Sequence, residues 1–284
     1  MADMKTILVT GANGNLGHAV ARTLLDKGLE VKAGTTRPET AKVPDGAQVA
    51  KVVYEQPETV GTALEGVDGL FLVAPPLDPE APAKLKPVID QAVAAGVSHI
   101  VFNSALGVDQ NEDAPLRMIE RHLMAAGVNY TILRPNFFME NFSSGFLAPM
   151  IAQGGIYLAA GDGKTSFIST EDIASVAAVA FKEKHFGTAY NLTGPSALDH
   201  AQVAGIISEV SGRPVRYHPL TEAEMLQGAR DQGMPESAAQ YMALLFQLVR
   251  QGWTAAITED VQKVTGRAPI AFSTFAQKHA AVWK

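Results

Sequence analysis

The sequence of 284 residues contains no cysteine. This absence excludes disulfides, thiolate catalysis and cysteine-ligated zinc. Blocks of lysine or arginine are also missing, and 23 basic residues against 29 acidic ones give a formal net charge of −6. Because no basic block is present to neutralise phosphates, we expect no charge-driven binding to nucleic acid.

Long apolar runs are missing as well. The longest stretch without a charged side chain, residues 141–161, is interrupted by Ser, Gly, Pro, Asn and Gln, so we expect no membrane span. The first predicted strand starts within a few residues of the N-terminus, which leaves no room for a signal peptide and favours a cytoplasmic protein. The histidines show no metal-binding spacing, and no metal site is expected.

A glycine-rich turn near the start of the chain is its most informative feature. Residues 6–9 predict a strand, Gly11, Gly14 and Gly17 follow at a spacing of three, and residues 16–25 have the apolar pattern of an amphipathic helix. Gly11 would permit a tight turn, Gly14 would let a pyrophosphate approach the backbone, and Gly17 would let the helix pack close to the strand. Free amides at the helix N-terminus would then face the phosphates.

A second predicted strand, residues 29–34, completes a strand–turn–helix–strand unit, which favours dinucleotide binding over a glycine-rich turn that binds nothing. At its end stand Thr35 and Arg37, where an NAD-preferring site would have Asp or Glu. A guanidinium suits a 2′-phosphate, so we expect NADPH rather than NADH, with Lys42 as a weaker second cation. The alternative is a solvated Arg37 paired with Glu39. The predicted cofactor contacts are Thr10, Gly11, Asn13, Gly14, Asn15, Leu16, Gly17, Arg37, Val73, Ala74 and Ser104.

Six predicted strands alternate with helices up to Pro135, which indicates an α/β fold with a Rossmann-type doubly wound parallel sheet. The strands are expected at residues 6–9, 29–34, 47–54, 69–74, 99–104 and 130–135, with helices at 57–64, 82–95 and 118–126. We expect an NAD(P)-binding domain over residues 1–135, to which segments near 165–195 return. Residues 136–284 are expected to form a smaller, mainly helical substrate lobe, with short strands at 167–169, 189–192 and 214–219.

The motif Thr10–Gly17, together with Arg37, Ser104 and the run from Tyr130 to Asn141, resembles the atypical short-chain dehydrogenase/reductases. More narrowly, it is similar to the NmrA-like group, which contains NADPH quinone reductases, triphenylmethane reductases and some azoreductases. The resemblance extends nearly from end to end and implies an NADPH-dependent reductase.

The chain departs from its relatives at two places. Relatives usually carry an Asp near the end of the third strand that holds the adenine, whereas this chain has Val53 there. Short-chain reductases also use a Tyr-x-x-x-Lys pair to pass a proton to a carbonyl oxygen, and no tyrosine here has lysine four residues later. If Glu120 corresponds to the glutamate that follows this lysine in relatives, Leu116 and Glu112 occupy the pair's positions.

Acceptors that take electrons into a delocalised system need no strong acid at that moment, so we expect quinones, azo compounds or cationic dyes as substrates. The predicted acceptor pocket consists of Asn136, Phe137, Phe138, Met139, Asn141 and Phe142, with Tyr241 and Trp253 closing it. The alternative for these side chains is interlobe core. Ser104 and Asn136 are weak catalytic candidates, Ser104 as a contact to an acceptor oxygen or only as a loop cap.

Two other functions are compatible with the missing pair. One is an NADP(H)-binding redox-sensing regulator with little or no turnover, and the other, less suited, is a nucleotide-sugar epimerase. The helix near residues 118–126 could pair two subunits in a homodimer, but nothing in the sequence decides this.

Overall fold

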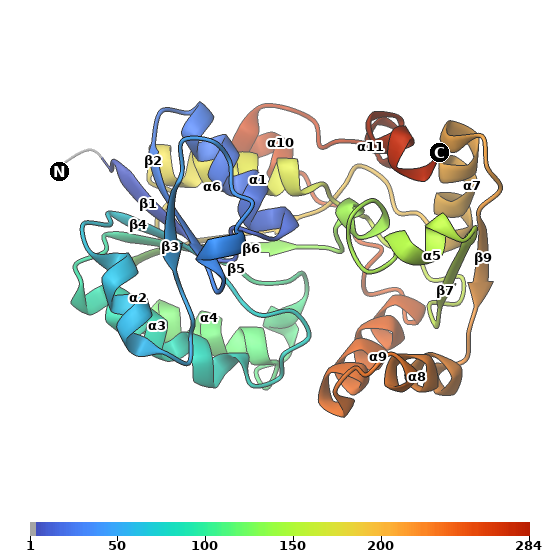
Figure 1. The fold of residues 1–284 in the computed structure, drawn as a ribbon, viewed down its shortest axis with the longest axis horizontal. Helices are drawn as coiled ribbons and strands as arrows, with labels where there is room; N and C mark the ends of the chain where they lie inside the picture. The colour runs from blue at the N-terminus through green and yellow to red at the C-terminus, as the bar shows by residue number, and fades with distance from the viewer. Residues whose placement is uncertain (1–3) are drawn as a thin grey trace.

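The computed structural model describes residues 4–284 as two lobes, and residues 1–3 of the predicted nucleotide-binding domain lie outside the described part (Figure 1). The larger lobe contains a seven-stranded parallel sheet in the order β3-β2-β1-β4-β5-β6-β8, which confirms the predicted Rossmann-type sheet. Its strands are β1 (Thr6–Val9), β2 (Glu30–Thr35), β3 (Gln48–Lys51), β4 (Gly69–Val73), β5 (His99–Asn103), β6 (Asn129–Pro135) and β8 (Thr188–Leu192).

Helices cover both faces of this sheet because its strands are apolar on both sides. Ile7 and Val9 of β1 pack into one layer of the core and Leu8 into the other, as the twofold period of a strand requires. The first layer is covered by α1 (Asn15–Asp26), α6 (Thr170–Glu183) and α10 (Asp260–Thr265). The second is covered by α2 (Pro57–Leu64), α3 (Ala81–Ala94) and α4 (Pro115–Ala125) (Figure 1).

The smaller lobe is mainly helical and has its own apolar core. It contains α5 (Ala148–Ala152), α7 (His200–Ser211), α8 (Glu222–Asp231), α9 (Glu236–Arg250) and α11 (Phe272–His279). Two short parallel strands, β7 (Gly155–Leu158) and β9 (Arg216–Pro219), pair beside them. Single 3₁₀ turns are η1 (Pro38–Thr40), η2 (Val108–Gln110), η3 (Met139–Phe142) and η4 (Ala280–Trp283).

Three details differ from the sequence-based expectation. The predicted strand at 167–169 is wrong, because Ile168 forms only an isolated bridge with Phe138. Strand β7 was not predicted. Helix α4 begins at Pro115 rather than Met118, since proline at the first helical position loses no intrahelical hydrogen bond.

The parallel strands all direct their carboxyl ends towards the smaller lobe (Figure 1). Strand β6 continues through Asn136 into η3, so the chain crosses between the lobes at this edge. In doubly wound folds this edge is where ligands bind. Within residues 4–284 no helix combines the length and the apolar content needed to cross a membrane.

Candidate functional site

The glycine turn between β1 and α1 has the geometry of an anion-binding turn. Gly11 has a φ of +63°, which other residues adopt rarely. A Cβ on Gly17 would lie 2.6 Å from the Gly11 carbonyl carbon and 2.8 Å from Ala12 Cα, so only glycine lets α1 approach the turn this closely. At Gly14 the nearest atom to such a Cβ is the Gly11 oxygen at 3.4 Å, and the backbone is open to a ligand.

Within residues 4–284, no side chain caps the N-terminus of α1. Its N-cap residue Gly14 has no side chain to accept a hydrogen bond, and its first turn contains no acidic residue. By contrast, α6 is capped by Ser169, and the Glu140 carboxylate accepts hydrogen bonds from the Ser169 hydroxyl and the Thr170 amide at 2.9 and 3.0 Å. The α6 terminus therefore has an anion of its own, whereas the α1 terminus is left for one from outside.

Three side chains predicted to contact the cofactor form hydrogen bonds around the turn. The Thr10 hydroxyl donates to the Phe71 carbonyl and accepts from the Val73 amide, which joins the ends of β1 and β4. Asn13 accepts from the Lys42 amide at 2.8 Å, and Asn15 accepts from the Ser144 hydroxyl.

Leu16 is buried in the core of the first lobe. Asn13 and Asn15 are exposed, line a crevice beside the turn and use only their side-chain oxygens in these hydrogen bonds, so their contact with the cofactor stays a prediction.

Arg37 and Lys42 are exposed cations on the loop that follows β2. Within residues 4–284 neither forms an ion pair, so the alternative pairing of Arg37 with Glu39 is not observed. The Thr35 hydroxyl accepts a hydrogen bond from the Arg37 amide at 3.3 Å and orders the start of the loop. Beside the turn lies a crevice of about 350 Å³ lined by Asn13, Gly14, Asn15, Lys42, Glu140 and Thr170, among others.

The carboxyl end of β4 lies next to the turn. Val73 is half-buried, and its Cβ is 3.9 Å from the position that a Cβ on Gly11 would take. Its carbonyl accepts a hydrogen bond from the Tyr54 hydroxyl at 2.7 Å, and burial raises the pKa of Tyr54 to about 12. Tyr54 is thus a neutral donor that fixes the β4 end and not a proton source at neutral pH.

Beyond Ala74, the β4–α3 loop reaches the second lobe. Leu77 has a φ of +53°, a strained value for a bulky residue, and packs against the core of the smaller lobe. At the third strand, Val53 is half-buried at the position where relatives have an Asp for the adenine, and Thr59 forms hydrogen bonds with its amide and carbonyl.

Ser104, at the end of β5, belongs to a buried ionic network. It is 3% exposed, and its hydroxyl donates to Glu120 of α4 at 2.6 Å. Glu120 also accepts from Nε and Nη2 of Arg134, each at 2.8 Å, and from Arg117. Burial opposes ionisation, but the hydrogen bonds from Arg134, Ser104 and Arg117 hold the pKa of Glu120 below its usual value. The predicted catalytic or ligand contact by Ser104 therefore lacks a free donor, because the hydroxyl proton is committed to Glu120.

If Glu120 corresponds to the glutamate that follows the lysine in relatives, Glu112 and Leu116 occupy the positions of the short-chain reductase pair. Glu112 lies at the surface, where Arg117 and Arg121 hold its pKa near 2, and Leu116 packs against the apolar core.

Asn136 is 5% exposed and joins three parts of the chain. Its amide nitrogen donates to the Ser166 hydroxyl at 2.8 Å and to the Thr254 carbonyl at 2.7 Å, while its oxygen accepts from the Phe137 amide. Both N–H groups of the Asn136 amide are already hydrogen-bonded, so neither is free to donate to an acceptor as the prediction requires. Its position instead fixes the crossing between the lobes.

The predicted aromatic pocket is split by the structure. Phe137, Asn141 and Phe142 line a cavity of about 10 Å³ in the smaller lobe, whereas Phe138 packs with the core of the larger lobe and Met139 is buried. Tyr241 of α9 is half-buried and does not line the cavity, and burial raises its pKa. Trp253 is 60% exposed and does not line this cavity, so its role in closing an acceptor pocket stays a prediction.

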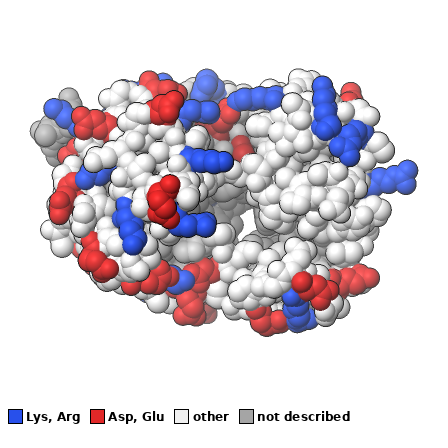
Figure 2. Space-filling view, viewed as in Figure 1, with Lys and Arg blue, Asp and Glu red and all other residues white. Residues whose placement is uncertain are grey.

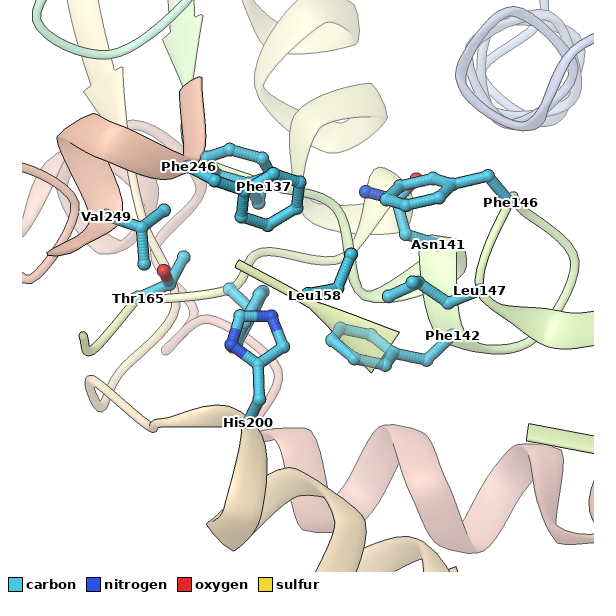
Figure 3. A pocket seen from close by; sticks show the side chains of 11 residues that line it. Phe137, Asn141, Phe142, Phe146, Leu147, Leu158, Thr165, His200, Phe246 and Val249 are labelled. Atoms are coloured by element: carbon cyan, nitrogen blue, oxygen red, sulfur yellow. The ribbon is translucent and has the colours of Figure 1, made fainter. Parts of the chain in front are cut away.

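The residues of the cavity wall that the sequence analysis did not select include Phe246 and His200. Phe246 of α9 faces Phe137 with ring centroids 6.1 Å apart, and His200 begins α7 and points into the cavity from below (Figure 3). Both lie on the buried faces of predicted helices, so the spacing of His200 with Val203 and Ile207 could have indicated its burial.

Between the lobes the surface is hollowed, and mostly uncharged atoms form the visible wall of the hollow (Figure 2). The carboxyl ends of the sheet strands lie on one side of it and the smaller lobe on the other (Figure 1). Within residues 4–284 no group of three or more His, Asp or Glu residues is placed to hold a metal ion.

Comparisons with known proteins agree with this geometry. Residues 3–257 match the model of the NmrA-like family. The chain is 35% identical over 286 residues to an NAD(P)H azoreductase of Xenophilus azovorans, covering 98% of this chain and 99% of the relative. A crystal structure of the NADPH-dependent quinone oxidoreductase QOR2 of Escherichia coli in complex with NADPH is similar, with 28% identity, a TM-score of 0.80 and coverage of 96% and 99%. The triphenylmethane reductase of a Citrobacter species in complex with NADP(H) matches with 26% identity, a TM-score of 0.80 and coverage of 97% and 99%.

Proposed function

Because the chain belongs to the NmrA-like family, we propose that it is an NAD(P)H-dependent oxidoreductase that prefers NADPH and reduces conjugated small molecules. The acceptors that we propose are quinones, azo compounds and triphenylmethane dyes, because relatives that match nearly the whole chain are named as reductases or oxidoreductases of these compounds.

The residues at the glycine turn fit this cofactor. The amides of Asn15, Leu16 and Gly17 at the uncapped start of α1 would hold the pyrophosphate, and Arg37 would hold the 2′-phosphate. Val73 and Ala74 would lie along the path towards the acceptor. When bound, NADPH supplies the hydride, and the protein supplies orientation and a cleft that limits access of water.

One feature of the sequence supports the choice of acceptor: no tyrosine in it has lysine four residues later, so the pair that passes a proton in short-chain reductases is missing. If Glu120 corresponds to the glutamate that follows this lysine in relatives, the positions of the pair hold Glu112, which is paired with arginines, and Leu116, which packs against the core. A simple ketone needs an acid as it is reduced, whereas a conjugated acceptor delocalises the added charge and can take its protons from water afterwards.

The test is to mix the purified protein with NADPH and a panel of quinones, azo compounds and triphenylmethane dyes and to follow the loss of nicotinamide absorbance. We expect turnover with at least one conjugated acceptor and none with simple ketones, and lower rates with NADH. The Gly17→Ala variant, in which the added Cβ collides with the turn, should lose this activity.

Tight binding of NADPH without oxidation by any acceptor would overturn the reductase. It would favour the second candidate, a regulator that senses NADP(H), for which the missing proton-donating pair is the supporting observation.

A further inference from the structure

His200 is a buried polar group that the proposed reaction does not yet use. The residue is 3% exposed, and its Nδ1 has no hydrogen-bond partner within residues 4–284. Aromatic rings surround it, with the centroid of Phe167 at 5.6 Å in an edge-on arrangement and that of Tyr217 at 5.5 Å. Because Nδ1 has almost no accessible surface, an occupant of the neighbouring cavity would reach the imidazole through its other nitrogen, Nε2.

The imidazole is neutral in this setting. Burial lowers the pKa of His200 to about 4, against a small opposing influence of the neighbouring Asp199 carboxylate. A neutral imidazole has one N–H donor and one acceptor nitrogen, which suits an uncharged oxygen better than an anion.

The cavity that His200 faces is small and mostly apolar. Its volume of about 10 Å³ is close to the least that holds one water molecule, so it fits a single oxygen atom rather than a ring. Phe137 and Leu158 stand opposite the imidazole (Figure 3). Thr165, which also lines the cavity, already shares a hydrogen bond with the Thr254 hydroxyl at 3.0 Å. His200 and Asn141 are therefore the polar side chains of the cavity wall available to an oxygen there, and His200 is the more deeply buried of the two.

The cavity also connects to the proposed nucleotide site through one segment of chain. Phe137, two residues beyond β6, is one wall, and the half-buried Asn141 and the 47% exposed Phe146 lie at the side towards solvent. Between them, Ser144 donates a hydrogen bond to Asn15 of the glycine turn at 3.1 Å. This hydrogen bond fixes the segment between Phe137 and Phe146, which forms part of the cavity wall, next to the first turn of α1.

We propose that His200 binds an oxygen on the far edge of the acceptor, such as the second carbonyl of a para-quinone, while the acceptor ring lies at the mouth of the cavity among Phe137, Asn141 and Phe146. This inference rests on the proposed reductase function and deepens it, since it names carbonyl-bearing rings as the preferred class within the conjugated acceptors. Acceptors without such an oxygen would bind without this contact.

The experiment compares His200→Leu with the wild type. Leucine preserves much of the volume but cannot hydrogen-bond. The matched control is His218→Leu, because His218 is an exposed histidine of β9 that stacks on Tyr157 outside the cavity. Binding of 1,4-naphthoquinone and of naphthalene is measured by calorimetry on protein saturated with NADP⁺, where no reduction occurs. We expect about tenfold weaker naphthoquinone binding in His200→Leu, unchanged naphthalene binding, and no effect of His218→Leu.

A second readout uses the histidine ring itself. In protein carrying ¹⁵N-labelled histidine, the resonances that disappear in His200→Leu should shift on addition of naphthoquinone and not on addition of naphthalene. Urea unfolding of each variant confirms that it folds. His200→Gln, which keeps a polar group, should recover part of the naphthoquinone affinity.

The inference would be overturned if wild type and His200→Leu bound naphthoquinone with equal affinity, or if the variant lost affinity equally for naphthoquinone and naphthalene. The cavity would then be a site for an ordered water molecule. That failure is distinct from failure of the proposed function. If the wild-type protein oxidises NADPH with quinones while His200→Leu binds them normally, the reductase stands and only the role of His200 falls.

Discussion

Replacement of Arg37 by alanine tests the cofactor preference most directly. The guanidinium is exposed and has no ion pair within residues 4–284, so its removal leaves no buried partner unsatisfied. Surface changes of this kind alter the free energy of unfolding by about 0.5 kcal/mol or less. Any large effect of Arg37→Ala must therefore come from the ligand.

The size of the effect follows from the charge of the 2′-phosphate. A hydrogen bond to a charged group contributes about 1.5–3 kcal/mol, and solvent exposure of Arg37 favours the lower part of this range. Since 1.4 kcal/mol corresponds to a tenfold change in affinity, the Kd for NADPH should rise roughly 10- to 100-fold at low salt. The Kd for NADH, which lacks the phosphate, should change less than about twofold on the same reasoning.

The assay is titration of wild type and variant with NADPH and NADH, followed by cofactor fluorescence at low and high ionic strength. Glu39→Ala, a change at an exposed acidic residue of the same loop, is the control and should not weaken NADPH binding. Salt should weaken NADPH binding more in the wild type than in Arg37→Ala, because the screened contact is absent from the variant. Equal losses for both cofactors, or no loss for either, would refute the assignment of Arg37.

The remaining predictions concern the turn, the buried network and pH. Gly17→Ala should reduce NADPH affinity at least about tenfold, because α1 must move away from the turn whose amides bind the phosphates; calorimetry showing wild-type affinity would contradict this. Ser104→Ala removes a buried hydrogen bond to a carboxylate and should lower the free energy of unfolding by about 1.5–3 kcal/mol, measured with urea; a neutral result would mean that the bond contributes nothing net. Burial lowers the pKa of His99 and His200 to about 4, below the unfolded value, so the unfolded chain binds more protons and stability falls as pH decreases from about 6.5 to about 4. At pH 5 each imidazole should cost about 2 kcal/mol relative to pH 7, partly offset by Asp172, whose pKa burial raises to about 6; urea midpoints that do not change between these pH values would contradict the prediction.

The fold was largely accessible from the sequence because its signals are local. Strands such as β4 are continuous apolar runs, and the turn into α1 is specified by glycines three residues apart. The prediction of a strand at 167–169 was wrong. A short apolar run can bury its side chains without a ladder of hydrogen bonds, and here Ile168 forms only one bridge, with Phe138 of the segment that crosses between the lobes. Strand β7 was missed because its pairing partner, β9, lies far along the chain and no local turn joins the two strands.

The candidate site was accessible only in part. The glycine turn and the exposed Arg37 were identified from spacing and chemistry, and their geometry agrees with those expectations without testing ligand binding. The side chains of Thr10, Asn13 and Asn15, which are predicted to contact the cofactor, also bind neighbouring loops and strands, and the sequence did not show these bonds. Sequence spacing places a residue at a turn but does not say which of two nearby polar groups it will meet.

The sequence by itself determined the parallel sheet, the crossing after β6, the glycine turn at the start of α1 and the absence of a Tyr-x-x-x-Lys pair. Each of these depends on residues a few positions apart. Only the tertiary structure decided that Ser104 donates to Glu120, that Trp253 lies at the surface and that His200 shares a cavity with Phe137. These outcomes depend on how separate helices and strands pack, and packing is set by the whole core rather than by any one segment.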